Sequence, residues 1–223
     1  MQIPGYYMTR PAQNDENTAD FERIYYDMMA QDGAAEINYT LTAPKWQFLC
    51  YLAEKKNLLL HGSANAAIAE FEPRQSNDVD EFGNRCAIYA ASDGLWPMYF
   101  AIVNRDVVTS LVNACFHVRS GDGHAAETYY YFSVNQAAFA QGPWQNGMIY
   151  LLPRDTFEQQ IMEPYNGLAI ESTQWASAVA VKPLAKLAVT PDDFPFLDQV
   201  NGHDPQLVSE RAARNPDGFP WRE

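Results

Sequence analysis

Cysteine is scarce in this chain, whose 223 residues contain only Cys50, Cys86 and Cys115. No two of them form a CxxC pair, which excludes a zinc knuckle or a thioredoxin-like motif on spacing. An odd number of cysteines in apolar surroundings, with no secretory signal in 1–10, is typical of buried thiols in a reducing compartment. No apolar run reaches the length of a membrane span. We therefore expect a cytoplasmic protein without a membrane partner.

Basic residues are also few, with 15 Lys and Arg against 28 Asp and Glu and a net charge of -13. Nucleic-acid binding draws most of its affinity from basic side chains that contact phosphates. The sequence contains no basic cluster that would offset this balance. The composition therefore disfavours a DNA or RNA partner and leaves the oligomeric state open.

Several common catalytic motifs are missing as well. GxSxG, GxGxxG and GxxxxGK[ST] do not occur, which disfavours a serine hydrolase, a Rossmann fold and a P-loop. The four histidines form no HxxxH or HxH pair; they are His61, His117, His124 and His203. We therefore predict no metal site, because such sites need several ligands at helical or hairpin spacing.

The order of apolar patterns predicts one domain over residues 1–223, with early helices followed by strands. Residues 1–17 are polar and expected to be loose, and the Pro-rich residues 190–223 are expected to wrap the surface. Helical patterns cover 20–30, 44–56, 94–102 and a single turn at 157–162. Strand patterns cover 57–61, 86–91, 110–118, 128–134, 148–152, 175–181 and 185–189, with a turn at 121–123. The predicted fold class is α+β, with a split, mostly antiparallel sheet.

One histidine stands in a distinctive place. His61 ends the apolar run from Leu58 and directly precedes Gly62 and Ser63. A glycine there lets a ligand approach the backbone closely, and its N–H and C=O suit a planar amide. His61 and Ser63 would add side-chain hydrogen bonds. The alternative is that His61 caps the strand and bonds a neighbouring carbonyl, and the sequence leaves both open.

Three short blocks resemble the poly-ADP-ribose-polymerase branch of the ADP-ribosyltransferases. Residues 60–65, Leu-His-Gly-Ser-Ala-Asn, resemble the family's His-Gly-Ser/Thr strand. Residues 86–92, followed by an apolar helix, are similar to its tyrosine-bearing strand, with Tyr89 as the tyrosine. Residues 172–175, followed by the strand pattern to 189, resemble the strand that carries its glutamate. The resemblance spans residues 57–190 and implies an ADP-ribosyltransferase-like, split antiparallel core.

The resemblance implies NAD as co-substrate and a role for each matched residue. His61 would bond the 2′-hydroxyl of the adenosine ribose, Gly62 the nicotinamide carboxamide, and Ser63 the nicotinamide ribose. Tyr89 would stack on the nicotinamide ring. We add Arg74 as the candidate for the pyrophosphate, because a guanidinium matches phosphate geometry.

The same aromatic residues also fit an ordinary core. The chain has 13 tyrosines, so one tyrosine in an apolar strand is a common occurrence. Trp96, Tyr99 and Phe100 recur at helical spacing, which is more typical of core packing than of ligand contact.

The chain departs from the family pattern at Gln174, which stands where the family has its glutamate. An amide carries no charge, and loss of one preorganised electrostatic contact costs about 2.7–4 kcal/mol in the transition state. Three alternatives follow: Gln174 serves a transferase that adds single units, Glu171 is the true acid, or the chain binds NAD or ADP-ribose without turnover.

The expected function is transfer of single ADP-ribose units to a protein or small-molecule acceptor. An RNA 2′-phosphotransferase-like enzyme shares the His-Gly start, but the net charge of -13 disfavours it.

Overall fold

The computed structural model describes residues 3–13, 15–31, 33–78, 80–119, 127–164 and 167–222. The predicted turn at 121–123 and His124 lie outside these ranges. Within them, none of the helices has both the length and the apolar character that crossing a membrane requires. The predicted α+β class, with early helices and mostly antiparallel sheets, is confirmed.

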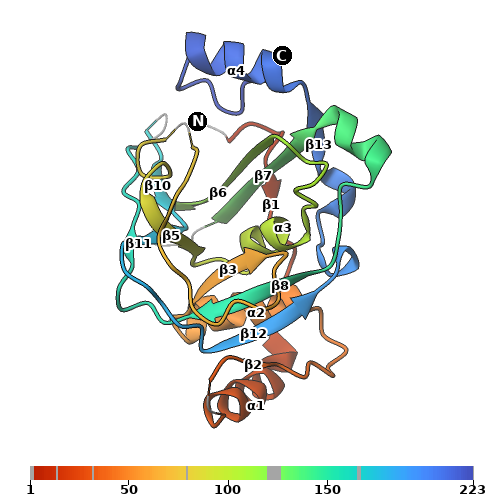
Figure 1. The fold of residues 1–223 in the computed structure, drawn as a ribbon, viewed down its shortest axis with the longest axis vertical. Helices are drawn as coiled ribbons and strands as arrows, with labels where there is room; N and C mark the ends of the chain where they lie inside the picture. The colour runs from red at the N-terminus through yellow and green to blue at the C-terminus, as the bar shows by residue number, and fades with distance from the viewer. Residues whose placement is uncertain are drawn as a thin grey trace.

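The larger of two sheets carries all three blocks of the resemblance. Its order is β2 (Ala35–Glu36), β12 (Ala185–Val189), β8 (Gly147–Leu152), β3 (Leu59–Ser63), β5 (Cys86–Ala91), β11 (Gln174–Ser177) and β9 (Glu158–Gln159), with β4 (Arg74–Gln75) also on β5. All pairs are antiparallel except β2 with β12. The strands β12, β8 and β3 lie side by side in this sheet (Figure 1), and β8 is buried along nearly its whole length.

The smaller sheet packs beside it. Its order is β1 (Met8–Thr9), β7 (Glu127–Asn135), β6 (Leu111–Arg119) and β10 (Ala169–Ser172), with β13 (Asn201–His203) parallel to β7. Only Thr173 separates β10 from β11, so the chain passes directly from one sheet into the other. The Thr173 hydroxyl donates to the Cys115 carbonyl at 3.0 Å, and its own carbonyl accepts from the Ser92 N–H at 2.9 Å. This buried threonine joins the two sheets.

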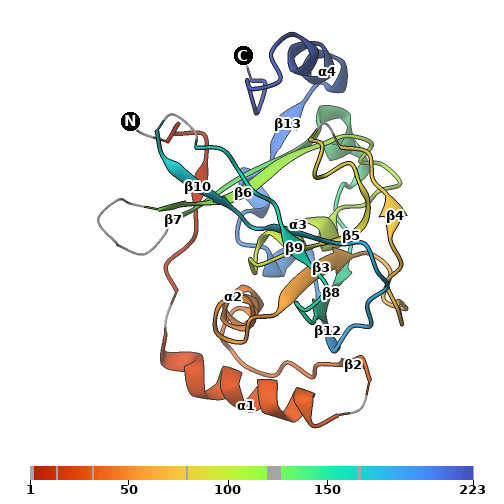
Figure 2. The same ribbon diagram turned by 90° about the vertical axis from the view of Figure 1, so that its left-hand side faces the viewer.

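Four α-helices occur in the described residues. They are α1 (Thr18–Met29), α2 (Lys45–Lys55), α3 (Trp96–Ile102) and α4 (Pro205–Arg214), with 3-10 turns at Asp15–Asn17, Gln136–Gln141, Pro191–Asp193 and Leu197–Gln199. Helix α1 buries Phe21, Ile24 and Met28, which lie on one face at helical spacing. Helices α1 and α4 stand at opposite ends of the molecule (Figures 1 and 2).

The main core lies between the two sheets and encloses α2 and α3. Its members run from Phe21 to Val200 along the chain. A second, smaller core covers the opposite face of the larger sheet, around Leu59, Ile88 and Tyr150. The larger sheet is therefore apolar on both faces, which explains why β3 and β8 read as continuous apolar runs.

The prediction of a loose N-terminal segment is wrong. Met8 and Thr9 pair with Tyr130 and Tyr129 as strand β1. Arg10 then reaches inward and forms an ion pair with the fully buried Asp93, at 2.7 Å. The polar sequence of this segment suggested exposure to solvent. Its backbone and the Arg10 side chain instead bond residues far away in the chain, which the local sequence does not reveal.

Three smaller predictions are also corrected. The expected helical turn at 157–162 is instead strand β9, because its backbone completes the sheet edge next to Trp175. Cys86, expected to be buried, is exposed at the start of β5. Residues 190–223 do more than wrap the surface, since they add β13 to a sheet and place Phe194 and Phe196 in the main core.

Candidate functional site

Strands β3 and β5 part after a single pair. Leu60 lies opposite Ala91, and the same edge of β5 is next paired at Ala87, by Arg74 of β4. Between these points the described ladder leaves the β5 edge at residues 88–90 without a strand partner. On the other side, residues 61–63 of β3 still pair with β8 but no longer with β5. We call this opening the β3–β5 gap.

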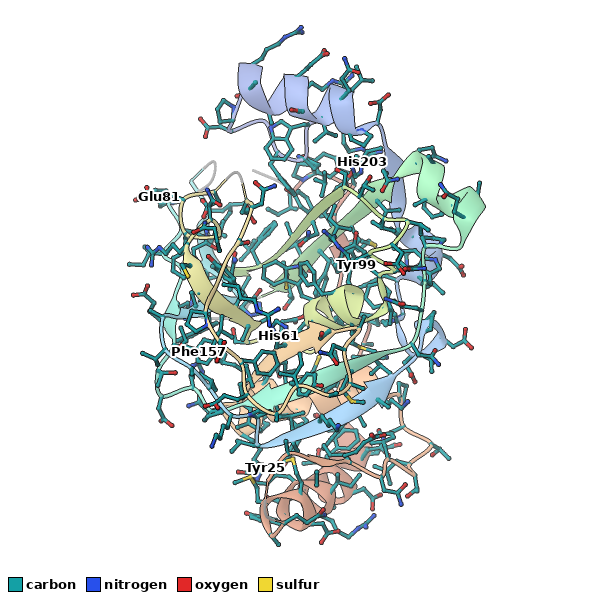
Figure 3. All side chains as sticks on the ribbon, viewed as in Figure 1. Tyr25, His61, Glu81, Tyr99, Phe157 and His203 are labelled. Carbon is teal, nitrogen blue, oxygen red and sulfur yellow. The ribbon has the colours of Figure 1, made fainter. Side chains whose placement is uncertain are left out.

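The imidazole of His61 occupies one side of the gap. Its Nδ1 lies 2.6 Å from the Tyr89 carbonyl oxygen, and its ring packs against Phe71 at 4.7 Å. A carbonyl only accepts, so Nδ1 carries the hydrogen and Nε2 keeps a lone pair in the neutral ring. Burial lowers the pKa of His61 below its ordinary value, against the raising effect of this hydrogen bond. His61 lies near the middle of the molecule, far from His203 at the α4 end (Figure 3).

The second nitrogen of His61 retains access to solvent. Within the described chain, the only buried side-chain nitrogen or oxygen without a hydrogen-bond partner is Oε1 of Gln47. Nε2 of His61 is therefore not sealed in the core, and no described group bonds it. Nδ1 bonds a neighbouring carbonyl, as expected if His61 caps the strand. Nε2 remains a hydrogen-bond acceptor without a described partner.

The backbone of Gly62 faces the same gap. Alternate residues of a strand direct their N–H and C=O to the same edge. The Tyr89 carbonyl points into the gap, so Ala91 points toward β3, and its partner Leu60 points toward β5. Gly62 follows Leu60 by two residues, so its N–H and its C=O both point into the gap.

Gly62 also needs to be glycine for packing. A Cβ at this position would lie 1.8 Å from the Pro97 carbonyl oxygen and 2.8 Å from the Ala101 nitrogen. Helix α3 therefore rests directly on the β3 backbone. Its start is held by Asp93, whose Oδ1 accepts from the N–H groups of Leu95 and Trp96, both at 2.8 Å.

Helix α3 carries two adjacent aromatic residues that differ in burial. Tyr99 is fully buried, in agreement with the core interpretation, but Phe100 is 38% exposed. Phe100 belongs to the same turn of α3 as Pro97 and Ala101, whose backbones rest on β3, and its ring contacts those of Trp96 and Tyr99. Helical spacing alone did not separate the two residues, because adjacent positions at the border of an apolar face look alike in sequence.

Tyr89 contacts His61 through its backbone, not through its ring. Ile88 and Ala90 belong to the smaller core, on the face of the sheet that also holds Leu59. By strand alternation, the His61 ring points to that face and the Tyr89 ring to the opposite one. The hydroxyl of Tyr89 donates to the Phe82 carbonyl and accepts from the Arg85 N–H, both at 2.8 Å.

Gln174 lies on the same face as Tyr89. It pairs with Ala91, and its neighbour Ala176 pairs with Tyr89. Gln174 is two strands from β3, which corresponds to about 10 Å between backbones. Its N–H donates to the Ser172 hydroxyl at 3.0 Å, while its side chain is partly exposed.

The structure does not bring Glu171 to the gap. Glu171 belongs to β10 in the smaller sheet, opposite His117. Its carboxylate accepts from Nε and Nη2 of Arg119, at 2.9 and 2.7 Å. Burial raises the pKa of Glu171, but Arg119 outweighs it and the net shift is downward.

Ser63 and Arg74 flank the gap from its two sides. The Ser63 hydroxyl accepts from the Asn65 N–H at 3.1 Å and so shapes the turn that follows β3. Arg74, in β4, is exposed and lies opposite Ala87 on the far rim. Of the predicted site residues, the structure places His61, Gly62 and Ser63 on one side of the gap and Tyr89 and Arg74 on the other, with Gln174 one strand beyond. It does not bring the His61 and Tyr89 rings together, because they lie on opposite faces of the sheet.

Two hollows of about 550 and 340 Å³ lie elsewhere. The larger is formed where the N- and C-terminal segments meet, between Tyr6, Phe196 and Arg222. Neither hollow is lined by a predicted site residue. Within the described ranges, no three His, Cys, Asp or Glu side chains converge as metal ligands would.

Comparison of the chain with family models, curated proteins and solved structures gives no match.

Proposed function

We propose that this chain binds NAD in the β3–β5 gap and transfers single ADP-ribose units from it to a protein or small-molecule acceptor. One observation carries the proposal: the peptide groups of Gly62 line an interrupted sheet edge directly after His61, whose Nδ1 bonds the opposite strand and whose Nε2 has no described partner. Such an edge offers a paired donor and acceptor, which a planar carboxamide matches as another strand would.

The neighbouring groups fit the remaining parts of NAD. Nε2 of His61 is an acceptor, which suits a ribose hydroxyl, since a hydroxyl can donate to it. Tyr89 and Phe100 both lie on the α3 side of the sheet and offer aromatic faces for a flat cationic ring, each worth on the order of 1 kcal/mol. Arg74 on the far rim is a partner for the pyrophosphate.

The reaction would proceed by loss of nicotinamide from the ribose. The nicotinamide leaves with the electron pair of the glycosidic bond, an acceptor nucleophile attacks the same carbon, and the acceptor loses its proton. Positive charge develops on the ribose, as in glycoside hydrolysis. Gln174 supplies a carbonyl dipole without charge, so we expect slow turnover and no polymer.

Binding and turnover of NAD test the proposal directly. Calorimetry should detect NAD binding by the wild type, and His61→Ala should weaken it at least tenfold. His203→Ala is the matched control, because His203 is likewise partly buried but lies at a distant place, where its ring nitrogens bond Ser133 and Ser110. Absence of binding by the wild type, or equal loss in both variants, would refute the assignment of the gap.

A second candidate function is binding of NAD or ADP-ribose without turnover. The specific observation in its favour is the lack of an available carboxylate, since position 174 is an amide and Glu171 is engaged by Arg119. Chromatographic measurement of released nicotinamide separates the two. Bound NAD that stays intact over many hours would favour binding without turnover.

A further inference from the structure

Three polar side chains are hydrogen-bonded in series at one end of the smaller sheet. Nε2 of His203 lies 2.9 Å from the Ser110 hydroxyl oxygen, and Nδ1 lies 2.7 Å from the Ser133 hydroxyl oxygen. Ser110 directly precedes β6, Ser133 belongs to β7, and His203 ends β13. We call these three residues the Ser–His–Ser cluster.

Strand pairing holds the cluster in place. His203 lies opposite Asn135 in the parallel pair of β13 and β7. From the other edge of β7, the Asn135 N–H donates to the Ser110 carbonyl at 3.2 Å. Ser133 is two residues before Asn135, so both side chains lie on one face of β7. The three members are therefore fixed by the hydrogen bonds of a sheet and not by a loop.

The hydrogen bonds give the cluster a direction. The Asn201 carbonyl, 3.0 Å from the Ser133 hydroxyl, can only accept, so the hydrogen of Ser133 points to it. The Ser133 oxygen then accepts from Nδ1 of His203, and Nε2 keeps the lone pair of the neutral ring. Burial lowers the pKa of His203, against the raising effect of Asp204. Near neutral pH, Nε2 is thus an acceptor for the hydroxyl hydrogen of Ser110.

One end of the cluster lies at the surface. Ser133 is fully buried, whereas Ser110 and His203 are partly exposed. Their chain neighbours Thr109 and Asp204 are exposed. A small molecule in solvent therefore has a route to the Ser110 hydroxyl, while Ser133 holds the imidazole from the inside.

Two backbone N–H groups beside the Ser110 hydroxyl converge on one oxygen. Thr109 and Ser110 both donate to Oδ1 of Asn135, at 2.9 and 3.3 Å. Acyl transfer by a serine uses N–H groups of this kind, including that of the serine itself, to bind the negative oxygen of the tetrahedral intermediate. The Asn135 carboxamide oxygen marks that place in this chain.

We propose that Ser110 is a nucleophile for acyl transfer, with His203 as its general base and Ser133 as the residue that positions the imidazole. The site is separate from the β3–β5 gap, since His203 lies at the α4 end of the molecule, far from His61 (Figure 3). Neither Ser110 nor His203 lines one of the two hollows, so we assign small carboxylic esters as its substrate class. The absence of GxSxG does not bear on this arrangement, because such triads are defined by geometry and not by sequence spacing.

The reaction would proceed in two balanced steps. The Ser110 oxygen attacks the carbonyl carbon of the ester while its proton passes to Nε2 of His203, and the carbonyl oxygen replaces Asn135 Oδ1 on the two N–H groups. The bond from that carbon to the alcohol oxygen breaks, and the alcohol leaves with the proton from His203. Water then attacks the acyl-Ser110 ester by the same route and releases the carboxylic acid.

Labelling by a fluorophosphonate, followed by mass-spectrometric mapping, tests the nucleophile. The reagent should form a bond from phosphorus to the Ser110 oxygen with loss of fluoride, and Ser110→Ala should not be labelled. His203→Ala should slow labelling by a factor of about 100 or more, as expected for a general base.

The matched control is His117→Ala. His117 is also partly buried, and its Nδ1 lies 2.9 Å from the Thr128 hydroxyl oxygen. It is seven residues along the chain from Ser110, or about 23 Å in a strand. This variant should be labelled at the wild-type rate.

Hydrolysis of p-nitrophenyl acetate tests the positioning role. Ser133→Ala should lower the maximal rate about tenfold, the effect of one lost hydrogen bond, and leave the ester concentration at half-maximal rate unchanged. Ser133→Thr keeps the hydroxyl and should restore most of the rate.

Labelling of another serine, no labelling of the wild type, or equal rates in wild type and His203→Ala would overturn the proposal. Mapping on the wild type needs no substitution, so it decides the case even where a variant disturbs β13.

Discussion

The ion pair between Arg10 and Asp93 gives the sharpest prediction about stability. Asp93 is fully buried, and its Oδ2 accepts from Arg10 Nη2 and from the Tyr130 hydroxyl, both at 2.7 Å. Arg10→Met keeps the apolar stem of the side chain and removes its charge. The carboxylate is then buried without a counter-charge. Loss of one partner of a buried pair costs about 3–5 kcal/mol, which for a chain of this length lowers Tm by roughly 6–20 °C.

The pH dependence of this loss identifies its cause. Burial alone raises the pKa of Asp93, but Arg10 and the donated hydrogen bonds hold it below its ordinary value. In the wild type this contribution is present above the unfolded pKa and disappears as the pH falls through the lower, folded pKa. In Arg10→Met the pKa of Asp93 rises, so folding favours its protonation. The stability difference between the two proteins should therefore be largest near neutral pH and shrink below about pH 5.

Urea unfolding followed by circular dichroism at several pH values measures this difference. Arg119→Met is the matched control, since Arg119 is 67% exposed and its pair with Glu171 should contribute at most about 1 kcal/mol. The reasoning would be refuted if Arg10→Met lowered the free energy of unfolding no more than the control does, or if its effect did not change with pH.

Three further predictions concern the gap. Gly62→Ala should destabilise the fold by about 1–3 kcal/mol in urea unfolding, because its Cβ meets the helix backbone; Gly5→Ala, with nothing within 4 Å, should be neutral. Gln174→Glu should raise nicotinamide release from NAD about 10²–10³-fold if this position faces the ribose, and an unchanged rate would remove it from the site. Phe100→Ala should weaken NAD binding about tenfold without changing Tm much, whereas Phe139→Ala, 39% exposed elsewhere, should leave calorimetric affinity unchanged.

Local pattern predicted the elements that are apolar and continuous. Cys86–Ala91 and Ala185–Val189 were predicted with their observed bounds, because buried strands end abruptly at polar or turn-forming residues. The same reasoning missed β9 and β13, which are short and polar. Their strand state depends on a neighbour's hydrogen bonds and not on their own side chains.

Burial on two faces also escaped sequence analysis. Tyr130 and Tyr131 are adjacent residues of the predicted strand 128–134 and point to opposite faces, yet both are at most 3% exposed. The outer face of β7 is covered by Tyr6, Tyr7 and Trp221, which come from the two ends of the chain. Contacts between distant segments of this kind leave no periodic signal in sequence.

The sequence by itself determined which strands carry the candidate site. The apolar run to His61 and the Tyr89 strand were predicted because each is short, apolar and bounded by turn signals, and they fold side by side with the Gln174 strand next to them. Only the tertiary structure decided what these residues face. It directs the Gly62 peptide groups into an interrupted ladder, turns the Tyr89 ring away from His61 and ties Glu171 to Arg119. Side-chain direction depends on register and pairing, which are properties of the assembled sheets and not of any one segment.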